Sequence, residues 1–304
     1  MMDLERYKGV FAAAPTPFFA DGTVDVETAG EMVDFYVEGG LSGIFALSST
    51  GEYFAMPQAE RERMAEAVVC AAAGRVPVMT MVSDACLSVV ESNIQIMAER
   101  GVDAVVLTAP YYYKYSQQEL ERFFVRAADM SPVPLLVYNQ PTRLPSGLSE
   151  ELVVQLADHP NIIGLKDTSN DAARLGRLAA ALAKREDFLY YAGSESLAAY
   201  AALLKVNYVY ALACVEPQLF VRMQAMARSG DVAGVLEAQG RVERLCELFR
   251  VMGGGSAESF SNFAAAIKAA MEVKGLGRAY TAQMGRLPSE EEYRKVHMIL
   301  ERTT

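Results

Sequence analysis

Histidine is scarce in this chain, which limits the ways in which it could bind a metal. The 304 residues include two histidines, His159 and His297, and neither lies in a pattern of spaced metal ligands. The four cysteines have no Cys-x-x-Cys or other ligand spacing, so they are predicted to be reduced thiols. A catalytic metal held by several histidines is therefore not expected.

Long apolar runs and clusters of basic residues are also absent. The longest apolar stretches, such as residues 104–107 and 162–165, are far too short to span a bilayer, so no membrane association is expected. The first residues lack a basic segment followed by an apolar one, and a cytoplasmic protein is the simplest interpretation. The formal net charge of −10 makes nucleic acid an unexpected partner. An anionic substrate is not excluded, because the attraction of one buried cation near the substrate can exceed the repulsion from negative charges on the distant surface.

The chain does have a regular series of short apolar runs. They predict strands at residues 10–14, 43–47, 76–82, 104–108, 135–138, 162–166, 188–192 and 207–211. Segments with a helical period lie between them, at residues 26–38, 58–73, 89–100, 117–128, 150–157, 171–184 and 197–204. Apolar strands that alternate with helices indicate a parallel sheet. Eight such units predict an α/β fold, a closed (β/α)8 TIM barrel.

After about residue 217 the strands stop and helical patterns continue. They cover residues 217–228, 232–252, 257–273 and 289–301. The first of these helices completes the barrel, and the other three are expected to form a C-terminal helical extension. We therefore predict a barrel domain over residues 1–230, which carries the active site, and an extension over residues 231–304.

Lys166 is the most informative residue at the carboxyl ends of the predicted strands, where such barrels place their active sites. It terminates the apolar run 162–165, a place where lysine is rare unless it is paired or functional. A lysine in a dry barrel mouth favours its neutral amine, which can add to a ketone carbonyl. An ion pair with the neighbouring Asp167 explains the position equally well. These residues alone leave both interpretations open.

Hydroxyl groups lie at other strand ends. Tyr138 ends the fifth predicted strand and Ser49 follows the second. A carbinolamine must gain and lose protons before water leaves, so an amine nucleophile needs a hydroxyl relay beside it. A single strand-end tyrosine is more often a packing residue, and the tyrosines at 111–113 could form a packing or subunit-contact patch. Thr50 and Gly51 lie between strand and helix, where free backbone N–H groups could hold a carboxylate.

Together these residues resemble the dihydrodipicolinate synthase/N-acetylneuraminate lyase family of class I aldolases. Ser49-Thr50-Gly51-Glu52 is similar to the family's Gly-Ser/Thr-Thr-Gly-Glu motif. Tyr138-Asn139-x-Pro141, followed 28 residues after its tyrosine by Lys166-Asp167-Thr168, is similar to the second family motif. Pro110-Tyr111-Tyr112 fits the aromatic segment after the fourth strand. The resemblance covers roughly residues 7–230.

The resemblance implies a pyruvate-dependent lyase that forms a Schiff base on Lys166 and needs no metal or organic cofactor. Tyr138 would move protons, and Ser49 would link it to Tyr112, which in family tetramers reaches in from a neighbouring subunit. Ser49 and Thr50 would hold the pyruvate carboxylate. The family also implies a homo-oligomer, a tetramer or a dimer, that acts on pyruvate and a small aldehyde or oxo acid.

The segments expected to bind the second substrate depart from the family pattern. Arg143 aligns with the arginine that grips the aldehyde's carboxylate in the synthases, but Leu144-Pro145 replaces the usual Thr-Gly. Gly193 and Glu195 are further expected substrate contacts. Tyr210, on the eighth strand, either narrows the pocket or fills the barrel.

Two reactions of the family therefore stay open. Arg143 favours a condensation of pyruvate with a carboxylate-bearing aldehyde, as in 4-hydroxy-tetrahydrodipicolinate synthase. Lys166-Asp167-Thr168 favours retro-aldol cleavage of a 4-hydroxy-2-oxo acid, a 2-keto-3-deoxy sugar acid or sialic acid. A barrel that binds a metabolite without catalysis is an alternative of another class, and a lysine-linked pyridoxal phosphate enzyme is a weaker one. The complete set of Ser49, Tyr112, Tyr138 and Lys166 favours an enzyme.

Overall fold

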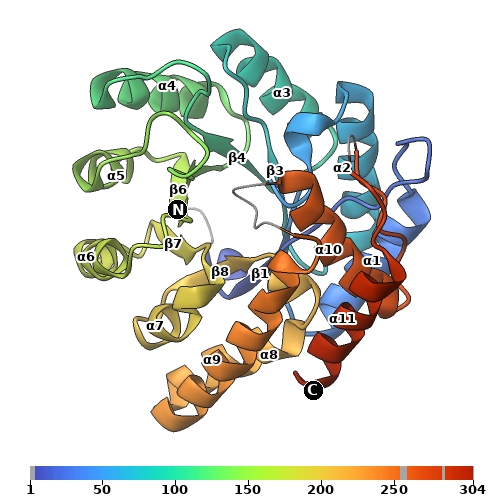
Figure 1. The fold of residues 1–304 in the computed structure, drawn as a ribbon. Helices are drawn as coiled ribbons and strands as arrows, with labels where there is room; N and C mark the ends of the chain where they lie inside the picture. The colour runs from blue at the N-terminus through green and yellow to red at the C-terminus, as the bar shows by residue number, and fades with distance from the viewer. Residues whose placement is uncertain (1–3, 254–258, 283–284, 304) are drawn as a thin grey trace.

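Eight short strands of buried residues close into a barrel in the computed structural model, which describes residues 4–253, 259–282 and 285–303 (Figure 1). They are β1 Val10–Ala13, β2 Gly43–Ala46, β3 Val78–Met81, β4 Ala104–Thr108, β5 Leu135–Asn139, β6 Ile162–Asp167, β7 Leu189–Ala192 and β8 Asn207–Tyr210. Each strand pairs in parallel with its neighbours, and β8 closes the ring on β1. Most strand residues are apolar because side chains fill the barrel inside and helices cover it outside.

Helices alternate with these strands and surround the barrel (Figure 1). They are α1 Val26–Glu38, α2 Gln58–Ala72, α3 Leu87–Glu99, α4 Gln117–Met130, α5 Glu150–Leu156, α6 Ala172–Leu182, α7 Ala198–Leu203 and α8 Pro217–Ser229. The predicted TIM barrel is confirmed. Each strand starts and ends within one residue of its predicted range, except that β3 begins two residues later than predicted.

Side-chain caps define where several helices begin. Ser116 accepts a hydrogen bond from the backbone N–H of Glu119, and the Glu119 carboxylate accepts one from the N–H of Ser116. Ser149 caps α5 by accepting from the N–H of Leu152. Such caps satisfy N–H groups that have no partner inside the helix, and each contributes about 1 kcal/mol. Local sequence thus determines the helix starts in the loops that follow β4 and β5.

Gly164 allows β6 to lie close to its neighbours. A Cβ atom there would come within 2.3 Å of the backbone oxygen of Leu189 in β7 and within 2.9 Å of the Leu136 side chain in β5. No side chain fits in that space. Because strand residues two apart share a face, Lys166 lies on the same face of β6 as Gly164.

Three further helices follow the barrel: α9 Val232–Cys246, α10 Phe260–Val273 and α11 Glu290–Glu301. Helix α9 is shorter than predicted, because a 3-10 turn at Glu247–Arg250 takes over after Cys246. Residues 257 and 258, where the next helix was expected to begin, lie outside the described residues. The predicted helical extension is thus present.

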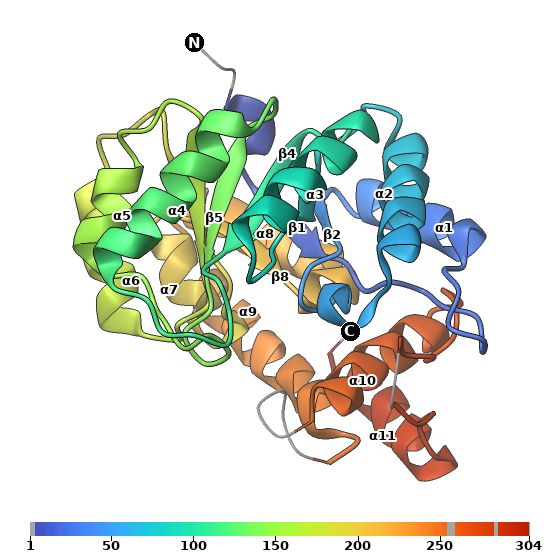
Figure 2. The same cartoon turned by 90° about the horizontal axis from the view of Figure 1, so that it is seen from above.

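The extension packs against the barrel. Figure 2 shows α10 and α11 at the end of the barrel opposite the short 3-10 helix Glu5–Tyr7. Val242, Ile267 and Val296, one from each added helix, belong to the same apolar cluster as the barrel residues. The predicted division into two domains after residue 230 stays a prediction. Among the described residues, no helix has the length and apolarity needed to cross a membrane.

Candidate active site

Strands β5 and β6 bring Tyr138 and Lys166 side by side, because the two residues are direct partners in the parallel ladder. Lys166 is only 4% exposed, and its Nζ lies 4.3 Å from the centre of the Tyr138 ring and 4.9 Å from that of Phe45. The two rings meet edge to face. Aromatic faces attract an ammonium group without neutralising it. The amine of Lys166 thus lies over two rings, Phe45 of β2 and Tyr138 of β5, which together form an aromatic platform.

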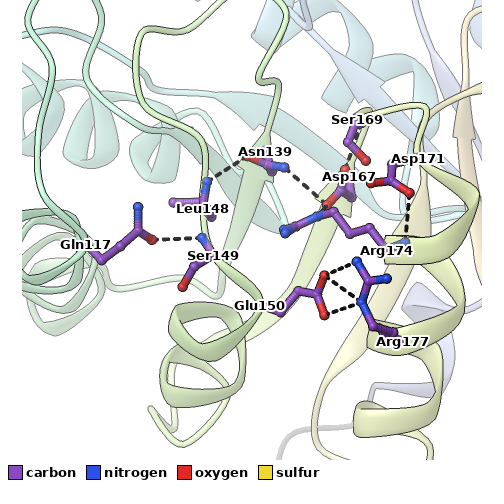
Figure 3. A network of polar contacts seen from close by, with 10 residues as sticks. All are labelled: Gln117, Asn139, Leu148, Ser149, Glu150, Asp167, Ser169, Asp171, Arg174 and Arg177. Carbon is purple, nitrogen blue, oxygen red and sulfur yellow. Dashed lines mark hydrogen bonds and ion pairs between the residues drawn. The ribbon is translucent and has the colours of Figure 1, made fainter.

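Asp167 points the other way, because consecutive residues of a strand face opposite sides of the sheet. Its Oδ2 accepts hydrogen bonds from Arg174 Nε at 2.7 Å and from Asn139 Nδ2 at 3.2 Å (Figure 3). Its Oδ1 accepts one from the N–H of Ser169 at 2.8 Å. Within the described part of the chain, Lys166 Nζ has no ion pair or hydrogen bond. The interpretation of Lys166 as the ion-pair partner of Asp167 is therefore wrong.

The Arg174–Asp167 pair is expected to stabilise the strand that carries Lys166. The two side chains are 11% and 2% exposed, so replacing Arg174 by methionine leaves a carboxylate buried with its main partner removed. We expect Arg174→Met to lower the free energy of unfolding by about 3–5 kcal/mol, measured by urea denaturation.

The neighbouring pair of Arg177 and Glu150 provides a matched control (Figure 3). Its side chains are 58% and 28% exposed, and exposed pairs contribute at most about 1 kcal/mol. Arg177→Met should therefore change the stability far less than Arg174→Met. Equal losses in the two variants would contradict a special role of the buried pair.

The segment Ser48–Glu52 forms a tight turn after β2. The hydroxyl of Ser48 accepts a hydrogen bond from the N–H of Gly51 at 3.3 Å, and Thr16 Oγ1 donates one to the oxygen of Gly51 at 2.7 Å. A Cβ at Gly51 would lie 2.9 Å from the oxygen of Ala14, so the turn requires glycine there. The predicted carboxylate-binding residues, Ser49 and Thr50, lie at the tip of this turn. The turn follows the strand that carries Phe45.

Tyr112 stands apart from the other predicted catalytic residues. It is 83% exposed, and its ring contacts the ring of Tyr113 at 4.9 Å between centroids. Its φ of +79° is strained for a bulky side chain, and such strain is often kept for function. Within one chain no described contact joins Tyr112 to Ser49 or Tyr138.

Arg143 lies at the rim of the site. Its guanidinium carbon is 4.7 Å from the centre of the Phe260 ring, which belongs to α10 of the extension. Burial of the guanidinium lowers the pKa of Arg143, and the nearby phenol of Tyr138 opposes that shift. The predicted carboxylate anchor therefore lies against α10 of the extension, through its contact with Phe260.

Gly193, a predicted substrate contact, packs against Lys166 and Thr168. A Cβ there would lie 2.1 Å from Thr168 Oγ1 and 3.1 Å from Lys166 Cε. The Thr168 hydroxyl is buried and has no hydrogen-bond partner among the described residues. Thr168 was not among the predicted site residues, although its spacing of two residues from Lys166 was a usable signal. A buried hydroxyl without a partner is suited to bind a polar group of a substrate.

Glu195 and Tyr210 are placed differently from expectation. Burial raises the pKa of Glu195, whose Oε1 accepts hydrogen bonds from the N–H groups of Ala211 at 2.8 Å and Leu212 at 3.3 Å. Its carboxylate thus fixes the end of β8. Tyr210 stacks on Tyr208 with centroids 5.0 Å apart, and its ring centre lies 5.3 Å from that of Phe220.

Phe220 belongs to α8, so the Tyr210 side chain lies between the barrel wall and the helix layer. The expectation that Tyr210 contacts substrate is corrected by this placement. Among the described residues, no group of three or more His, Cys, Asp or Glu side chains is arranged to hold a metal ion.

The sequence matches the Dihydrodipicolinate synthetase family over residues 6–303. It is 35% identical over 228 residues to the 4-hydroxy-tetrahydrodipicolinate synthase of Laribacter hongkongensis, covering 74% of this chain and 77% of that protein. It is 30% identical over 252 residues to the N-acetylneuraminate lyase of Rhizobium meliloti, covering 82% of each. The relatives therefore include both a synthase and a lyase.

Solved structures agree with this match. The dihydrodipicolinate synthase of Bacteroides thetaiotaomicron is similar with a TM-score of 0.90 and 26% identity, over 97% of this chain and 98% of that one. YagE, a prophage protein of the dihydrodipicolinic acid synthase family from E. coli K12, was solved in complex with pyruvate. It has a TM-score of 0.90 and 25% identity, and the match covers 98% of both chains.

Proposed function

The chain belongs to the dihydrodipicolinate synthetase family, and on that premise we propose that it forms a Schiff base between Lys166 and pyruvate. The observation that carries the proposal is the state of Lys166: buried at a strand end, held over two aromatic rings and not paired with Asp167. The relatives are lyases, so an enzyme is favoured over a barrel that only binds a metabolite.

In the proposed reaction, the neutral amine of Lys166 adds to the ketone carbon of pyruvate and gives a carbinolamine. Protonation of its hydroxyl lets water leave, and an imine remains. Tyr138 would carry these protons, and the 4.3 Å between its ring centre and the amine supports this role. The imine then accepts the electrons released when the neighbouring methyl carbon loses a proton. The resulting enamine attacks an aldehyde, or in the reverse direction is released by carbon–carbon cleavage.

The other predicted residues fit this scheme as binding and relay groups. Ser49 and Thr50, at the tip of the turn after β2, would hold the pyruvate carboxylate through hydroxyl and backbone N–H groups. Tyr112 would complete the relay from Ser49 in a second copy of the chain. Its exposure, its strained φ and the exposed Tyr113 ring beside it support such a contact.

Because Tyr112 is proposed to contact a second copy, we propose that the chain forms a homo-oligomer, either a tetramer or a dimer. We also propose that the protein is cytoplasmic. Sedimentation of the purified protein measures the assembly, and a lone monomer at assay concentration contradicts it.

Reductive trapping tests the Schiff base. The purified protein is incubated with pyruvate and borohydride, digested and measured by mass spectrometry. We expect one pyruvate-sized adduct, on the peptide that contains Lys166. If no such adduct forms, the proposed function is wrong.

Two observations bear on the second substrate. Arg143 lies over Phe260 and near Tyr138, where it could anchor the carboxylate of an aldehyde, which favours the condensation typical of the synthases. The unpartnered hydroxyl of Thr168 and the lyase relative favour the alternative, cleavage of a 4-hydroxy-2-oxo acid, a 2-keto-3-deoxy sugar acid or sialic acid. We propose the condensation as the leading reaction.

Replacing Arg143 by alanine separates the two reactions. If Arg143 anchors the aldehyde's carboxylate, Arg143→Ala should lower kcat/KM for condensation more than about tenfold, which is 1.4 kcal/mol, while reductive trapping of pyruvate is unchanged. Both condensation and cleavage are assayed with the variant and with Arg122→Ala, an exposed arginine on α4, as the control. A smaller loss means that Arg143 is not the principal anchor.

A further inference from the structure

A buried ion pair joins helix α10 of the extension to the turn after β2. Lys268 contacts the Oε1 of Glu52, and both side chains are 3% exposed. Lys268 Nζ also donates to the backbone oxygen of Tyr280 at 2.7 Å and lies 4.3 Å from the centre of the Phe18 ring. The second carboxylate oxygen of Glu52 accepts from the N–H of Ala282 at 2.9 Å. Both oxygens of the Glu52 carboxylate are therefore held by groups from the C-terminal extension.

Glu52 is the last residue of a strained turn. Its φ is +59°, and that of Leu47 at the other end of the turn is +55°. The left-handed region is unfavourable for residues other than glycine, so this path needs restraint from its surroundings. The N–H of Glu52 donates to the oxygen of Ser49 at 2.9 Å, which ties the strained residue directly to the tip of the turn. A displacement of Glu52 would therefore move Ser49 and Thr50.

A contribution to stability does not by itself explain why Lys268 and Glu52 form a buried ion pair. Burial lowers the pKa of Lys268 and the Glu52 carboxylate opposes that shift, which shows the cost of removing the charges from water. An apolar pair of similar size usually stabilises a fold as well as a buried ion pair does. What an ion pair adds is a defined geometry.

We propose that Lys268 is a positioning residue: through Glu52 it holds the turn of Ser49 and Thr50 in the geometry that receives the pyruvate carboxylate. The inference rests on the proposed function and extends it to the C-terminal extension. Helix α10 is then part of the framework of the active site.

A second ion pair of α10 provides the control. Lys274, at the end of α10, contacts Glu216 at 2.6 Å, just before α8 begins. It also connects the extension to the barrel, but it does not contact the turn after β2. Its side chains are 25% and 17% exposed. Loss of this pair weakens the docking of α10 without releasing Glu52.

The experiment compares the full-length protein with three variants: Lys268→Met, the double variant Glu52→Gln/Lys268→Met, and Lys274→Met. Thermal unfolding reports stability, and hydrogen–deuterium exchange of peptides covering residues 47–55 reports the order of the turn without substrate. The pyruvate concentration that gives half-maximal borohydride trapping reports carboxylate binding. The double variant carries no unpaired buried charge, so it is expected to recover stability and to fold if Lys268→Met does not.

We expect faster exchange of the turn and a rise of about tenfold or more in the half-maximal pyruvate concentration for both variants that lack Lys268. Lys274→Met should stay within about twofold of the unchanged protein in both measurements. The proposal is overturned if the double variant recovers tight pyruvate binding together with its stability. It is also overturned if variants lacking Lys268 match Lys274→Met, or if exchange rises while pyruvate binding is unchanged.

A failure of the proposed function is distinguishable from these outcomes. In that case pyruvate does not label the unchanged protein at any concentration, and the exchange of the turn still shows whether Lys268 orders it.

Discussion

Replacing Lys166 by methionine is expected to abolish the pyruvate adduct and to lower turnover by roughly 10⁴-fold or more, because the variant lacks the amine that forms the imine in the proposed reaction. Methionine keeps an unbranched apolar chain of similar length, so the contact with the rings of Phe45 and Tyr138 is retained and the barrel should fold. The measurement is kcat with pyruvate and the second substrate, together with the mass of the protein after borohydride reduction.

Lys184, an exposed residue just after α6, is the control for this prediction. Lys184→Met should keep both the adduct and the turnover of the unchanged protein. If Lys166→Met still gains one pyruvate-sized adduct, another amine is the nucleophile, and the aromatic platform at Lys166 has a different purpose.

Replacing Tyr138 by phenylalanine should have the second largest effect. The substitution removes only the hydroxyl and leaves the ring in place beside the amine, so Lys166 stays positioned. Without the phenol, proton transfer to and from the carbinolamine loses its nearest relay, which should lower kcat by about 10²–10⁴-fold. The KM for pyruvate should change little, because in the proposed site the turn after β2, and not Tyr138, holds the carboxylate. Initial-rate kinetics measure the two parameters separately.

The time course of reductive trapping adds a second readout for Tyr138. In Tyr138→Phe the adduct should form more slowly and reach the same final extent. Tyr113→Phe, at an exposed position, serves as the control. A loss of kcat smaller than about tenfold would show that protons travel by another group, for which the buried hydroxyl of Thr168 is a candidate.

The sequence alone determined the barrel and predicted that Tyr138 and Lys166 lie together at its carboxyl end. Strands buried on both faces read as continuous apolar runs, so their number and order can be counted along the chain. Because parallel strands end at one edge, Tyr138 and Lys166 were expected to be neighbours, and the ladder between β5 and β6 pairs them directly.

Only the tertiary structure decided which face of a strand each polar residue occupies. A strand that is apolar on both sides carries no alternating pattern, so the sequence could not show that Tyr210 faces α8 instead of the lumen. Asp167 could be taken as a partner of Lys166 because the sequence does not show its contact with Arg174, on the following helix.

The long-range contacts of the extension were also invisible in the sequence. Lys268 and Glu52 are 216 residues apart, and Phe260 and Arg143 are separated by more than a hundred. Local periodicity predicts that a helix forms and which of its faces is apolar, but not which charged group it will meet. That choice depends on how α10 packs over the carboxyl end of the barrel, and this packing brings Lys268 to the turn of Ser49 and Thr50.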